Sequence, residues 1–151
     1  MGHVDLYVRN TMLTVGQDDF LHSLFSTIAY QVEREGWGSR FPALMKELYM
    51  GRLPKERVPQ ARDELQQVRQ ELSKLPPEAR VYNYDEPNQP TPWPVPPGAT
   101  TLADCFLSSN GKNVLDLLER ALDVSEEVGA DVEIRPFDKA GTYNYFVSGS
   151  Q

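Results

Sequence analysis

Residues 3–35 read HVDLYVRNTMLTVGQDDFLHSLFSTIAYQVERE, and their hydrophobic period changes once, near residue 17. Before that point, Val4, Leu6 and Val8 alternate with polar residues, which is the period of a half-buried strand. After it, apolar residues recur every three or four positions, as in an amphipathic helix. The stretch therefore predicts a strand over 3–10, extended or followed by a second short strand over 12–15, and then a helix from 17 or 18 to 35.

The predicted helix has recognisable ends. Asp18 and Asp19 fall in its first turn, where a carboxylate interacts favourably with the helix dipole. Gly36 is expected to end it, because glycine readily adopts the left-handed conformation found after helices. Trp37 follows in a glycine-rich turn and is interpreted as a core residue beneath that turn.

The remaining sequence predicts three more helices and several short strands. Apolar spacing indicates helices over 41–50, 59–74 and 114–128, the last capped by Asn113. Short apolar or β-branched runs indicate strands over 79–84 and 132–135, with further candidates over 102–107 and 142–147. Because helices and strands do not alternate strictly, we expect an α+β fold: a small mixed or antiparallel sheet packed against a single layer of about four helices.

Length and composition predict one domain over residues 1–151. Residues 85–98 hold six of the twelve prolines, so this segment is predicted to be a proline-rich loop with polyproline II character. Residues 137–151 are expected to form a C-terminal strand or tail.

Charge and cysteine content limit the classes of partner and the cellular compartments that we expect for this protein. The net charge of −7 disfavours nucleic acid as a partner, because phosphate binding requires a basic surface. Apolar stretches are too short to span a membrane. A single cysteine and an N-terminus unlike a signal peptide indicate a cytoplasmic protein.

Residues that commonly carry catalysis or bind metals are few. His3, His22 and Cys105 are the only histidines and cysteine, and their spacing does not match a zinc site. Cys105 is interpreted as a small buried residue, and His22 as a histidine at the boundary of the core. We therefore expect no catalytic site, metal or cofactor. A small enzyme using His22, Tyr84 and Asp85 is the least favoured alternative.

The candidate partner-binding residues are Tyr84, Asp85, Glu86 and Trp93. Aromatic side chains flanked by acids, on a rigid loop with little conformational entropy to lose, are typical of an interface hot spot. The alternative is that Trp93 only fastens the loop to the body of the protein.

The order of motifs resembles a known class of proteins. ELSKLPP at 71–77 ends a helix, and a short strand follows that ends in Tyr84-Asp85-Glu86. A proline/tryptophan loop comes next, then Leu102 and Phe106, and SNGK at 109–112 leads into another helix. Over about residues 60–135 this order resembles a bacterial immunity-protein family that neutralises polymorphic toxins. The resemblance implies a cognate toxin domain as the partner, bound tightly so that its active site is occluded or locked inactive. A non-catalytic interaction module that uses the 85–98 loop is the alternative.

Overall fold

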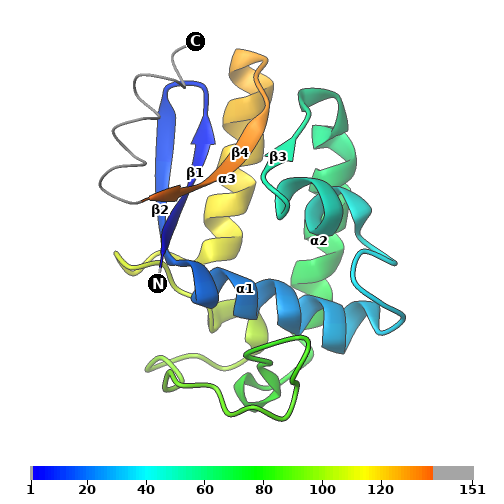
Figure 1. The fold of residues 1–151 in the computed structure, drawn as a ribbon, viewed down its shortest axis with the longest axis vertical. Coiled ribbons are helices and arrows are strands. Elements are labelled where there is room, and N and C mark those ends of the chain that lie inside the picture. The colour runs from blue at the N-terminus through cyan, green and yellow to red at the C-terminus, as the bar shows by residue number, and fades with distance from the viewer. Residues whose placement is uncertain (1, 138–151) are drawn as a thin grey trace.

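A computed structural model describes residues 2–137 of the chain (Figure 1). Its sheet contains β1 (His3–Val8), β2 (Thr11–Gln17), β3 (Arg52–Leu53) and β4 (Val132–Phe137) in the order β2-β1-β4-β3. Every neighbouring pair is antiparallel. The predicted α+β fold is confirmed, and of the two sheet types expected the antiparallel one is present.

Helices account for most of the remaining regular structure. They are α1 (Asp18–Thr27), η1 (Ile28–Glu33), η2 (Ala43–Leu48), α2 (Val58–Leu72) and α3 (Val114–Val128). Short 3₁₀ turns, η3 to η5, occupy Lys55–Arg57, Pro77–Ala79 and Leu102–Asp104. The predicted cap of α3 is confirmed, since Leu115 N–H donates to Oδ1 of Asn113 at 2.8 Å.

Strand β1 lies at the centre of the fold. It pairs with β2 on one side and β4 on the other, and Val4 to Val8 are all buried. Helix α3 packs on β1 and β2 through its apolar face, and α2 packs on α3. Cys105 is buried in the same core, and burial raises the pKa of its thiol, as expected for a structural cysteine.

The first helix departs from its prediction near its end. It is α-helical to Thr27 and continues as a wider π-helix to Glu33, closed by a hydrogen bond from Arg34 N–H to the Ala29 carbonyl at 2.9 Å. Arg34 adopts the left-handed conformation (φ 71°), so the helix ends before Gly36. The segment predicted as a helix over 41–50 is likewise a π-helix, η2. A repeat of three and four residues does not distinguish these wide turns from an α-helix.

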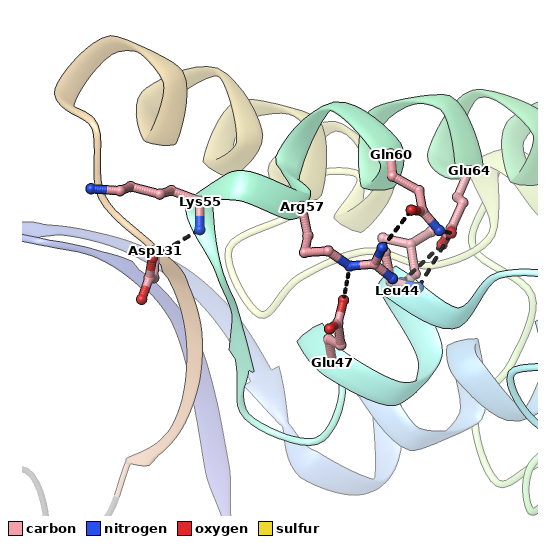
Figure 2. A network of polar contacts seen from close by, with 8 residues as sticks. Leu44, Glu47, Lys55, Arg57, Gln60, Glu64 and Asp131 are labelled. Carbon is pink, nitrogen blue, oxygen red and sulfur yellow. Dashed lines mark hydrogen bonds and ion pairs between the residues drawn. The ribbon is translucent and has the colours of Figure 1, made fainter.

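Buried carboxylates hold the irregular backbone between η1 and η2. Glu33 accepts hydrogen bonds from the N–H groups of Gly38, Arg40 and Phe41 at 2.9–3.0 Å. Glu64 on α2 accepts from the N–H groups of Ala43 and Leu44 at the start of η2. Figure 2 shows Glu64 beside Leu44 and Gln60, within a network that extends through Arg57 to Glu47.

The predicted strand over 79–84 is wrong. Only its first residue belongs to the 3₁₀ turn Pro77–Ala79, the backbone after it is irregular, and Val81 and Tyr84 form hydrogen bonds with side chains of α1. Val81 N–H donates to Oγ1 of Thr27 at 2.9 Å, and the Val81 carbonyl accepts from Ser23 Oγ at 2.7 Å. Tyr84 N–H donates to Ser26 Oγ at 3.0 Å. Residues 79–84 and the proline-rich loop that follows them consequently lie along α1, on the side away from the sheet (Figure 1).

The remaining strands and strand candidates have different outcomes. The candidate over 102–107 is wrong, because Thr101 and Asp104 form a capping box around the 3₁₀ turn Leu102–Asp104. The two-residue strand β3 was not predicted, since two residues carry no period. The candidate over 142–147 and the C-terminal strand or tail lie outside the described residues, apart from Phe137 at the end of β4.

Thr27→Val tests the attachment of residues 79–84 to α1. The substitution keeps the side chain's shape but removes the hydroxyl group that pairs with the buried Val81 backbone. We expect the free energy of unfolding to fall by about 1–3 kcal/mol, the usual effect of leaving a buried polar group unpaired. Thr27→Ser, which keeps the hydroxyl and loses one methyl group, should lose only about 0.8 kcal/mol. Urea unfolding measures both, and equal stability of the two variants would contradict the assignment.

Candidate functional site

The side chains of Tyr82 and Tyr84 belong to two separate aromatic clusters. Tyr84 packs edge-on against Trp37, with ring centroids 5.5 Å apart, and Trp37 continues to Tyr49 and His22. Tyr82 packs against Trp93, which also contacts Phe20 at a centroid distance of 5.1 Å. The predicted site residues Tyr84 and Trp93 therefore belong to different clusters.

Trp93 is half-buried, and its surroundings fasten the proline-rich loop to the protein. Besides its contacts with Phe20 and Tyr82, its carbonyl accepts a hydrogen bond from the Arg80 guanidinium at 3.0 Å. The next carbonyl, of Pro94, accepts a longer one from the same group at 3.4 Å. These contacts are the ones expected if Trp93 fastens the loop to the body of the protein. A contact with a partner stays a prediction.

Asp85 and Glu86 are exposed, and the chain around them borders two hollows. One hollow, of about 570 Å³, lies between this segment and η1 and is lined by Ala29, Tyr30, Gln31, Arg34, Tyr84 and Asp85. Tyr30 is 46% exposed there, a large fraction for an aromatic side chain. A second hollow follows the chain from Asp85 to Gln89. Tyr84, Asp85 and Glu86 thus form one continuous edge of an open surface.

A third hollow, which the sequence did not predict, lies at the start of α1. This cleft, of about 330 Å³, is lined by Asp18, Asp19, His22, Tyr49, Tyr82 and Asn83. Its volume is at the low end of the range of about 300–1,000 Å³ for small-molecule pockets. The cleft forms where the first turn of α1, the end of η2 and residues 82–83 meet. These segments are far apart in the sequence, so no local sequence pattern predicts the cleft.

Polar contacts inside the cleft pair its aromatic and charged groups. Tyr82 donates its hydroxyl hydrogen to Oδ2 of Asp19 at 3.0 Å, and Nδ1 of His22 lies 2.7 Å from the Tyr49 hydroxyl. The hydrogen bond to Asp19, followed by burial, raises the pKa of Tyr82. Burial, followed by the charge of Asp18, raises the pKa of Tyr49. Both phenols therefore stay protonated at neutral pH.

One acceptor atom in the cleft is unused. Oδ1 of Asp19 is buried and accepts no hydrogen bond from any described residue. A buried acceptor without a partner costs about 1–3 kcal/mol, so native structures rarely keep one without a reason.

His22 lies in this cleft, while Tyr84 and Asp85 line a different hollow. The three residues considered for a small enzyme therefore do not share one site.

Across residues 2–137, no group of three or more His, Cys, Asp and Glu residues is arranged to hold a metal ion. None of the helices in this part of the chain is long and apolar enough to cross a membrane.

A protein-family model described as Immunity protein 70 matches residues 6–134. The chain belongs to the Immunity protein 70 family. The match confirms the class of protein that the motif order resembled, and it extends that likeness from about residue 60 back to β1. No curated protein and no solved structure matches the chain.

Asp19→Asn tests the contact that orders the cleft. An asparagine carries no charge, so it opposes phenolate formation at Tyr82 less than Asp19 does, while burial and Asp18 still oppose it. The pKa of Tyr82 should therefore fall part of the way toward its usual value near 10. The pKa of Tyr49 depends on burial and Asp18 and should change little. NMR titration of ¹³Cζ-labelled tyrosine measures both, with Tyr82→Phe assigning the signal. An unchanged Tyr82 titration would contradict the hydrogen bond.

Proposed function

We propose that this Immunity protein 70 member neutralises a cognate toxin by binding it tightly in the cytoplasm, without catalysis of its own. The family match carries the proposal, because an immunity protein acts on a toxin made by the same kind of cell. The compartment is the one expected of a chain with a single, buried cysteine. A stable complex of this kind usually buries about 800 Å² on each partner, so the contact surface must extend beyond a single hollow.

The proposed contact surface, called here the 82–86 surface, consists of Tyr82, Asn83, Tyr84, Asp85 and Glu86. Its backbone is held by α1 through Val81 and Tyr84, so little conformational entropy remains to be lost on binding. Tyr84 is half-buried beside the exposed Tyr30, an arrangement suited to an aromatic anchor at the centre of an interface.

Charge supports a basic partner. The three hollows along the 82–86 surface are lined by four carboxylates, Asp18, Asp19, Asp85 and Glu86, and by one cation, Arg34. The whole chain carries a net charge of −7. A positively charged toxin face would be drawn to this surface by long-range attraction, and its association rate would fall as salt is added.

Trp93 has a supporting place in this proposal. Its ring covers Tyr82 and Phe20, and Arg80 holds its carbonyl, so the proline-rich loop is fixed next to the 82–86 surface. We propose that Trp93 borders the interface and keeps Tyr82 in position. Its replacement by alanine should weaken binding through this loss of support as well as through any direct contact.

A growth assay tests toxin neutralisation. The cognate toxin domain is expressed alone and together with the immunity protein. We expect growth to stop with the toxin alone and to recover with both, because a tight complex leaves little free toxin. Continued growth arrest in the presence of the folded immunity protein would contradict the proposed function.

A pair of double variants then locates the contact. Asp85→Lys with Glu86→Lys reverses two charges on the 82–86 surface. Asp63→Lys with Glu127→Lys reverses two exposed carboxylates on α2 and α3, with the same change in net charge. We expect the first pair to raise the Kd for the toxin by about tenfold or more, which is about 1.4 kcal/mol, and the second to change it little. Equal effects of the two pairs in calorimetry would place the contact elsewhere.

A further inference from the structure

The cleft at the start of α1 has the chemistry of a receptor for an organic cation. Among the six residues that line it, Asp18 and Asp19 are carboxylates, and neither Lys nor Arg is present. Asp18 is exposed and Asp19 is half-buried, so negative charge lies both at the surface and inside. A metal ion is a poorer match, because the described residues offer no cluster of three ligands.

Aromatic rings supply the second requirement. Tyr49, Tyr82 and the imidazole of His22 line the same cleft as the carboxylates. A planar guanidinium stacks on such rings and is attracted by their electron-rich faces. The chain itself uses this pairing elsewhere, where the Arg40 guanidinium lies 4.9 Å from the centroid of the Phe41 ring.

The unused acceptor of Asp19 points to a missing donor. The buried carboxylates Glu33 and Glu64 each accept hydrogen bonds on both oxygens. Asp19 accepts one on Oδ2, from Tyr82, and has none on its buried Oδ1. A partial rotation about the Cβ–Cγ bond, which is a soft torsion, would be needed to turn Oδ1 toward the cleft, and Oδ2 keeps accepting capacity beyond the bond from Tyr82.

We propose that this cleft receives an arginine side chain of the toxin, with Asp19 and Asp18 accepting its N–H groups and the tyrosine rings flanking its plane. The inference rests on the proposed function and names one contact within it. Arginine is favoured over lysine because its fork of donors matches a carboxylate in two places and its flat face matches an aromatic wall.

The site is tested first without the toxin, so that its failure is separate from failure of the growth assay. N-acetyl-arginine amide is titrated into the full chain and followed by ¹⁵N NMR. We expect saturable shifts confined to the amides of Asp19, His22, Tyr82 and Asn83. N-acetyl-citrulline amide, which has the same shape without the charge, should give none. Equal shifts with citrulline or N-acetyl-lysine amide, or shifts spread over the whole surface, would overturn the proposal.

Variants of the cleft complete the test. Asp19→Asn should abolish the arginine shifts and raise the Kd for the toxin by about tenfold, while Asp63→Asn, an exposed carboxylate on α2, should do neither. Asp18→Asn, on the exposed rim, gives a second reading if Asp19→Asn alters folding, and it should weaken arginine binding several-fold. Arginine binding that persists in both cleft variants would overturn the assignment. Growth rescue by these variants equal to that of the unaltered chain, with unchanged Kd, would show that the toxin does not use the cleft.

Discussion

The rest of the structure depends on hydrogen bonds between the polar side of α1 and an irregular stretch of backbone. Ser23, Ser26 and Thr27 are completely buried, although they lie on the side of α1 opposite its apolar contacts with the sheet. They are buried because residues 79–84 cover them and take their hydroxyl groups as partners for Val81 and Tyr84. Helix α1 therefore has two buried faces, one packed by apolar side chains and one by hydrogen bonds.

This arrangement links the core to the proposed interface. In a strand, the pleat of the sheet determines the directions in which side chains point. In residues 81–84, the positions of the hydroxyl groups on α1 determine these directions instead. Tyr82 is directed toward Trp93 and Asp19, and Tyr84 toward Trp37. Tyr82 lines the cleft at the start of α1, whereas Tyr84 lines the hollow beside η1. The proposed contact surface is therefore held by α1, and it carries the carboxylates and aromatic rings that support the proposal of a basic partner.

Local periodicity was enough to predict β1, α1, α2 and α3, because each carries regularly spaced apolar residues that enter the core. It misassigned residues 79–84, because the pattern of Val81 between polar neighbours is the same whether the backbone pairs with a strand or with a row of hydroxyl groups. The wide turns of η1 and η2 span six residues each, which is too short for their spacing to be distinguished from that of an α-helix. For the site, the acidic and aromatic cluster at Tyr84-Asp85-Glu86 was visible as adjacent residues. The cleft was not, because it joins residues 18–22, 49 and 82–83 through the tertiary fold.

Amide hydrogen exchange at Val81 and Tyr84 in the free protein tests most directly whether α1 holds this surface in place. If their N–H groups are bonded to Thr27 and Ser26, both should exchange only through large openings, at rates close to those of amides in the core helices. Exchange as fast as that of the exposed residues of the proline-rich loop would contradict the account, because the backbone that carries the proposed interface would then be free in solution.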